Sequence, residues 1–216
     1  MHDEPAIGNL QDDLQRLQQS QSHFLGRAMN RRDRVRSEFD PVALFSYAAL
    51  KRTVLLIDGF AQMIEGRNLV CAGALLRVQL DTALRFQAVF LVNDPRELAE
   101  AVLKGMRVNT LVDRQGRKLT DRHLVECAAV EFPWVESVYE QASGYVHFSE
   151  KHVLSDQSAV NANTTTSITL VNTSKFGDVS DASLCEAVGA FAKTIDLLDH
   201  YVGKCDQVLN DRRSAV

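Results

Sequence analysis

The sequence contains few of the residues that interrupt regular structure, with 4 prolines and 11 glycines among 216 residues. Loop-rich β-sandwiches and disordered chains need more of both, so helix is favoured. The sequence also lacks a C-x-x-C pair, because its cysteines lie far apart: Cys71, Cys127, Cys185 and Cys205. Cysteines spaced in this way, within apolar runs, usually behave as small buried hydrophobes.

The sequence has no strong excess of charge of one sign either, since its formal net charge is -4. No overall field therefore drives the protein onto nucleic acid or anionic lipid. A glycine-rich phosphate loop and a G-x-S-x-G motif are both missing, so we expect no cofactor. Residues 1–5 hold no basic region followed by an apolar run, so we expect no signal peptide and a cytoplasmic location.

Apolar residues make up 45% of the chain, enough for a hydrophobic core in one large domain. Their spacing, together with capping residues, predicts an all-α helical bundle with long terminal helices. A threonine-rich stretch predicts a short extended or hairpin excursion near residues 155–178. The expected helices carry Leu10 to Ala28, residues 41–65, 69–92, 95–104 and 120–130, a segment from Pro133, and Leu184 to Leu209.

Both terminal helices carry a narrow apolar seam with heptad spacing, the pattern that two helices need to pack side by side. The C-terminal seam runs from Leu184 to Leu209 behind a capping box of Ser183 and Glu186, and we expect the bundle core to need it. The N-terminal seam is shorter and is interrupted by Gln21. We expect residues 1–38 to form a helical extension that pairs two copies as a homodimer, and residues 39–216 to form the bundle domain.

The helix expected over residues 69–92 is apolar on all sides, which places it in the centre of a bundle. It is long enough to span a bilayer, but Arg77, Asp81 and Arg85 occupy its middle, so we expect no membrane span. These three charges are spaced i, i+4, i+8 and share one face. They form a surface salt-bridge ladder, a buried structural network with Asp58 or Glu65, or part of a functional site. Because this helix has no polar face, we expect Arg77 and Asp81 to be largely buried and hydrogen-bonded to other helices.

A second polar row, Tyr139, Ser143 and His147, has the same spacing on the helix after Pro133. Histidine commonly transfers protons, and the two hydroxyls could orient it; the alternative is three core residues with satisfied polar tips. As a functional site the two rows would supply candidate catalytic residues and candidate ligand-binding residues. The catalytic candidates are His147, Arg77 and Tyr139, and the ligand-binding candidates are Asp81, Arg85 and Ser143.

Two further motifs fall short of a known site. His147 and His152 resemble a zinc-protease pair, but five positions on a helix turn them 140° apart, so we expect no metal there. The basic run from Arg27 to Arg36 could touch phosphates, yet it lacks interleaved aromatics and is more typical of a solvated helix end.

The two polar rows carry a resemblance to an uncharacterised bacterial all-helical family that is related to HEPN-type helical bundles. The motifs are Arg77-x-x-x-Asp81 and Tyr139-x-x-x-Ser143-x-x-x-His147. The resemblance covers about residues 69–152 and implies a helical bundle. HEPN proteins are often ribonucleases or partners in toxin and phage-defence systems.

Active HEPN proteins carry an arginine a few residues before a histidine on one helix. Arg117 and His123 match this spacing, but Arg117 precedes Thr120, the expected helix cap, so we expect it to lie outside the helix.

Two function classes therefore stay open, and the sequence does not decide whether the protein is an enzyme. The first is a non-catalytic or ligand-sensing bundle that acts through self-association, a protein partner or a ligand. The second is a metal-independent RNase-like enzyme of a toxin or phage-defence type, which would use His147 or His123 with a nearby arginine.

Overall fold

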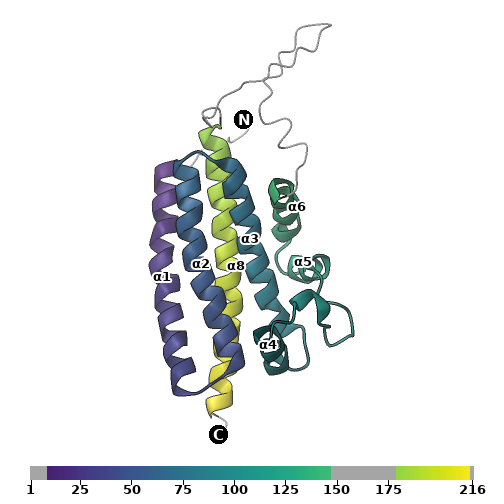
Figure 1. Ribbon diagram of the computed structural model, residues 1–216. Coiled ribbons are helices and arrows are strands. Elements are labelled where there is room, and N and C mark those ends of the chain that lie inside the picture. The colour runs from purple at the N-terminus through teal and green to yellow at the C-terminus, as the bar shows by residue number, and fades with distance from the viewer. Residues whose placement is uncertain (1–8, 147–178, 215–216) are drawn as a thin grey trace, which may run out of the picture.

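The computed structural model describes residues 9–146 and 179–214, with the backbone alone for Ser37 and 208–214. This part of the chain is all-α and contains seven α-helices and two 3₁₀ turns, as predicted (Figure 1). The excursion predicted near residues 155–178 lies outside the described residues. The elements are α1 (Leu10–Ser37), α2 (Pro41–Glu65), α3 (Leu69–Gln87), η1 (Ala88–Phe90), α4 (Pro95–Leu103), η2 (Val108–Thr110), α5 (Asp121–Ala129), α6 (Trp134–Val146) and α8 (Asp181–Ser214).

Aspartate side chains cap the N-termini of α2 and α4 at the positions that the sequence predicts. The Asp40 carboxylate accepts a hydrogen bond from the Val42 amide at 2.8 Å, ahead of Pro41. Asp94 accepts from the Arg96 amide at 2.8 Å in the same way, ahead of Pro95. A proline at the first helical position loses no hydrogen bond, because that amide has no partner within the helix. The predicted starts of α2 and α4 are therefore confirmed.

The central position predicted for the apolar helix is also confirmed. α3 contacts α2, α8, α6 and α5, and its Leu80, Ala83 and Phe86 have no exposed surface. α1, α2, α3 and α8 run side by side as long helices, while α4, α5 and α6 gather beside α3 (Figure 1). α3 ends at Gln87, earlier than predicted, and η1 follows it. Among the described helices, none has the length and apolarity that crossing a membrane requires.

α1 packs inside the bundle, against α2 and α8. Its seam residues Leu14, Leu17, Phe24 and Ala28 are all buried within the chain. The interrupting Gln21 donates a side-chain hydrogen bond to the Val54 carbonyl at 3.1 Å, so it fits the α1–α2 contact. The seam is thus occupied by the chain's own helices. A second copy is therefore not needed to cover the seam of residues 1–38, and the reason for expecting a homodimer there is removed.

α8 uses its seam in the core, as expected. Val188, Phe191, Ile195 and Leu198 are buried, and the Phe191 ring stacks on Phe60 with ring centroids 4.0 Å apart. The predicted cap was wrong by one turn. The Ser180 hydroxyl accepts from the Ser183 amide at 3.2 Å, and the helix begins at Asp181.

Gly73 sets how closely α3 and α6 approach each other. A Cβ atom built on Gly73 would lie 2.4 Å from two ring atoms of Tyr145. Real Cβ atoms essentially never come that close to another heavy atom, so the Tyr145 ring occupies the space that any side chain at position 73 would need. By contrast, a Cβ on Gly189 of α8 would meet nothing within 4 Å.

These two glycines predict stability changes of opposite sign. Gly73→Ala should lower the free energy of unfolding by about 1–3 kcal/mol, because overpacking forces α3 and α6 apart. Gly189→Ala, the matched control, should raise it by up to about 1 kcal/mol, because alanine favours helix without a clash. Urea denaturation followed by circular dichroism measures both. Equal effects of the two changes would contradict the close contact at Gly73.

Candidate functional site

The charged row of α3 forms a closed ion-pair network with α5. Arg77 Nη2 lies 3.2 Å from Asp121 Oδ2, and Arg85 Nη2 donates to Asp121 Oδ1 at 2.5 Å. Arg85 Nε donates to Asp81 Oδ1 at 3.1 Å, and Arg77 Nη1 lies 3.9 Å from the same oxygen. Two guanidiniums and two carboxylates therefore alternate around a ring with no net charge.

The carboxylate partner comes from α5 and not from α2. Asp121 is the first residue of α5, placed there by the Thr120 cap. Asp58 and Glu65, the partners expected from sequence, are engaged elsewhere: Asp58 accepts from Gln62, and Glu65 accepts from Gln18. That expectation was wrong because the charged row faces α5 and α6.

Arg77 also joins the second polar row. Its guanidinium carbon lies 4.2 Å from the centre of the Tyr139 ring, a cation–π contact. Its Nε donates to the Ser143 hydroxyl at 3.3 Å, and that hydroxyl donates to the Tyr139 carbonyl at 2.6 Å. The two rows therefore meet, as the sequence allowed. His147, the third member of the second row, lies outside the described residues.

Burial differs along the charged row. The Arg77 side chain is 13% exposed and bonded to two other helices, which confirms the prediction that it is buried and paired. The Asp81 side chain is 26% exposed, and its ion-pair partners Arg77 and Arg85 belong to its own helix. The prediction of contacts to other helices was therefore wrong for Asp81.

The arrangement of this network indicates a structural role, because it joins α3 to α5 and α6. Each carboxylate forms ion pairs with both arginines, and the Ser143 hydroxyl both donates and accepts. A general base needs a lone pair directed at a substrate proton. Here the charged groups are directed at one another, so the ligand and catalytic candidates Arg77, Asp81, Arg85 and Ser143 act first as structural partners.

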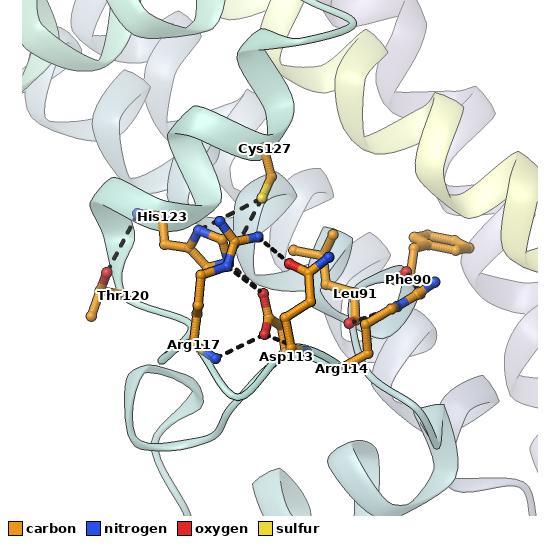
Figure 2. A network of polar contacts seen from close by, with 9 residues as sticks. Phe90, Leu91, Asp113, Arg114, Arg117, Thr120, His123 and Cys127 are labelled. Atoms are coloured by element: carbon orange, nitrogen blue, oxygen red, sulfur yellow. Dashed lines mark hydrogen bonds and ion pairs between the residues drawn. The ribbon is translucent and has the colours of Figure 1, made fainter.

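A second polar centre lies in the turn before α5 and joins Arg117 and His123 through Asp113, which the sequence did not single out (Figure 2). Asp113 is buried at its middle. Its Oδ1 accepts from the amides of Gln115 at 2.8 Å and Arg117 at 2.9 Å, which fixes the turn. Its Oδ2 accepts from His123 Nε2 at 2.9 Å and from Arg117 Nε at 3.2 Å. Since a carboxylate only accepts, His123 carries its proton on Nε2.

The available sequence signal for this centre was the aspartate at the start of a turn. Asp-Arg-Gln-Gly is typical of a side chain that caps its own turn, and Gly116 adopts a φ of +80° there. The position of Arg117 outside α5 is confirmed, since that helix begins at Asp121. Spacing alone could not show that Arg117 and His123 share one carboxylate.

Cys127 lies one helical turn beyond His123, but the two do not form a nucleophile and base. The Cys127 sulfur is 3.8 Å from both ring nitrogens of His123. A thiol that donated to Nδ1 would lie closer to that nitrogen than to Nε2. Burial raises the pKa of the Cys127 thiol above its ordinary value, which disfavours the thiolate that such chemistry needs.

A groove between α3, α6 and α8 is the third feature. Its volume is about 220 Å³. Burial raises the pKa of the Tyr145 hydroxyl, and the nearby Glu186 carboxylate raises it further. Its lining combines apolar residues with the polar side chains of Gln141, Tyr145, Ser183 and Glu186, and only the small residues on α3 and α8 could have indicated it from the sequence. Its lining residues are Leu69, Gly73, Leu76, Val138, Gln141, Ala142, Tyr145, Ser183, Glu186, Ala187 and Ala190.

No group of three or more potential metal ligands occurs within residues 9–146 and 179–207, whose side chains are described. The His147 and His152 pair lies outside them. Comparison of the chain with protein-family models, with curated proteins and with solved structures gave no match.

The ion-pair network predicts a ranking of stability losses. Asp121→Ala should lower the free energy of unfolding by about 1–3 kcal/mol, because it leaves Arg77 and Arg85 side by side without their shared carboxylate. The loss stays below that of a fully buried pair because the Asp121 side chain is 35% exposed. Asp81→Ala should cost about 1 kcal/mol or less, since both of its partners lie on its own helix.

Glu126→Ala is the matched control for this ranking, because Glu126 pairs with Arg122 on the exposed face of α5. It should change stability by less than about 0.5 kcal/mol. Urea unfolding of the three variants gives the order. An Asp121→Ala protein as stable as the Glu126→Ala protein would show that the network contributes no stability.

Asp113 predicts how stability depends on acid. Burial alone would raise the pKa of Asp113, but hydrogen bonds from Arg117, His123 and Gln115, with the Arg117 charge, lower it from 3.8 to about 2. A carboxyl whose pKa is lower in the folded state stabilises the fold above the unfolded pKa. That stabilisation is lost as the pH falls through the folded pKa.

The stability difference between the wild-type protein and Asp113→Asn should therefore be constant above about pH 5 and shrink between about pH 4 and pH 2. Urea unfolding at a series of pH values measures it. Asp94→Asn, at an exposed helix cap, is the control. A difference that does not change down to pH 2 would contradict the depressed pKa of Asp113.

Proposed function

We propose that the protein acts by binding, and that it holds a small amphipathic molecule in the groove between α3, α6 and α8. The observation that carries this proposal is the composition of the groove, in which apolar residues from three helices lie beside several polar side chains. Binding sites for small molecules typically have this character. Its volume of about 220 Å³ suits a ligand smaller than a typical cofactor.

The charge of the groove selects the kind of ligand. Among the described residues that line the groove, Glu186 is the one charged residue, and none is a lysine, arginine or histidine. After burial, the Glu186 carboxylate is the second cause that raises the pKa of Tyr145, another lining residue. A ligand with a short apolar chain and a cationic head, such as an alkylamine, complements both features.

A larger pocket of about 310 Å³ lies between α4 and the turn before α5. Two of its three carboxylates already have structural roles, since Asp94 caps α4 and Asp113 holds the turn. The groove therefore offers the better binding site.

The ribonuclease alternative has less support. Its Arg117 and His123 are brought together, but both are bonded to Asp113, and His123 is buried. An arginine that neutralises a buried carboxylate stabilises less of the charge that develops on a phosphate. The binding function is therefore the one that the described geometry favours.

The test is a titration of the full chain with n-hexylamine and with hexanoate, which both have six carbons in an unbranched chain but carry head groups of opposite charge. Protein amide chemical shifts measured by NMR should show saturable binding of hexylamine, with the largest changes at groove residues. Hexanoate should bind about tenfold more weakly, because Glu186 repels it. Ala190→Leu, which fills the groove, should abolish the response.

Glu186→Gln should remove the preference for the amine, and Glu140→Gln should leave it unchanged. Glu140 is the matched control, because it lies on the exposed face of α6 outside the groove. Shifts spread over the whole surface, or equal binding by the Ala190→Leu protein, would reject the groove as the binding site.

A further inference from the structure

The basic run at the end of α1 is not the solvated helix end that its sequence suggested. Arg27, Arg31 and Arg34 are spaced i, i+4, i+7 and lie on one face of the helix. Arg27 Nη2 donates to Asp206 Oδ2 at 2.6 Å, and its Nη1 pairs with Asp199. Arg31 Nη2 pairs with the other oxygen of Asp206. The face is thus turned inward, towards α8.

Arg31 is buried without full hydrogen bonding. Its side chain is 4% exposed, and Nη1 has neither solvent contact nor a hydrogen-bond partner among the described residues. A buried guanidinium nitrogen without an acceptor is costly, and such groups are rare in folded proteins. This nitrogen therefore indicates that an acceptor belongs next to it.

A pocket of about 220 Å³ adjoins this guanidinium, and α1, α2 and α8 all contribute to its walls. The lining residues are Arg27, Asn30, Arg31, Arg34, Leu50 and Asp206. Arg27 and Arg31 pair with Asp199 and Asp206, and Arg34 contributes a further guanidinium to the lining. Asp206 is shared by two arginines, so its repulsion of an anion is already offset.

We propose that this pocket binds a small phosphoryl anion, either inorganic phosphate or the phosphate group of a phosphomonoester. Arginine forks match the geometry of phosphate oxygens and form charge-assisted hydrogen bonds with them. Arg31 Nη1 is a donor that Asp206 does not use, and the Asn30 amide is a further donor among the lining residues. The site is separate from the groove between α3, α6 and α8 and does not depend on the function proposed for it.

A strand of RNA fits the pocket less well than a small anion does. Single-stranded nucleic acid is bound along open basic tracks with aromatic side chains for base stacking. This pocket is short, includes a carboxylate, and has no aromatic side chain among the described residues that line it. Binding of RNA without any binding of phosphate would therefore contradict the proposal.

The test is a thermal-unfolding titration of the full chain with potassium phosphate, with ionic strength held constant by potassium chloride. Phosphate should raise the melting temperature in a saturable way, since a ligand that binds only the folded state stabilises it. Arg31→Met should remove the effect, and Arg32→Met should keep it. Arg32 is the matched control, because it is one position away, pairs with Asp33, and does not line the pocket.

A second variant keeps the proposal testable if Arg31→Met does not fold. Asn30 is exposed and lines the pocket, so Asn30→Asp places a negative charge there without disturbing the core. It should weaken phosphate binding by about tenfold. Glycerol phosphate, titrated in parallel, distinguishes the two sources: tighter binding than inorganic phosphate assigns the site to a phosphomonoester, and equal binding assigns it to the free ion.

Three results would overturn the proposal. The first is a melting temperature that responds to phosphate no more than to chloride. The second is equal phosphate affinity of the wild-type and Asn30→Asp proteins. The third is binding of a short RNA, at the same ionic strength, without any binding of phosphate.

Discussion

The need to pair Arg77 inside the bundle shapes much of this structure. A guanidinium stays charged at any pH that a folded protein meets, so an arginine in a central helix must bring anionic or π partners with it. Arg77 obtains them from two elements, Asp121 at the start of α5 and the Tyr139 ring of α6. The position of α5 and α6 beside α3 is therefore tied to a single side chain. The Arg85 contact to the same Asp121 strengthens that tie.

The helices could be predicted because their signals are local. Asp40 before Pro41 and Asp94 before Pro95 fix where two helices begin, and each signal is contained in two adjacent residues. The central place of α3 followed from its apolar character on all sides. The start of α8 was harder to predict. Its capping residue is Ser180, three residues earlier than the serine expected from the sequence.

The partners of the polar residues could not be predicted in the same way. Spacing showed that Arg77, Tyr139 and Ser143 lie on single helix faces, but the rotation of each helix about its axis decides whether two faces meet. Asp121 illustrates the limit, since nothing in its local sequence distinguishes it from Asp58 as a partner. The buried position of Arg31 escaped prediction for a related reason: Asp206, which accepts its hydrogen bond, lies on α8, far along the chain.

That distance along the chain has a consequence for how the protein is made. The contacts of Arg27 with α8 span 172 and 179 residues, so α1 meets one of its partners only after α8 has been synthesised. Until then, the apolar seam of α1 can be covered by α2 alone, and the buried arginines have no aspartate from α8. A chain stalled before residue 199 would expose unpaired cations beside an uncovered core. The bundle therefore cannot close before α8 is made, and chains truncated ahead of it are natural substrates for chaperones and proteases.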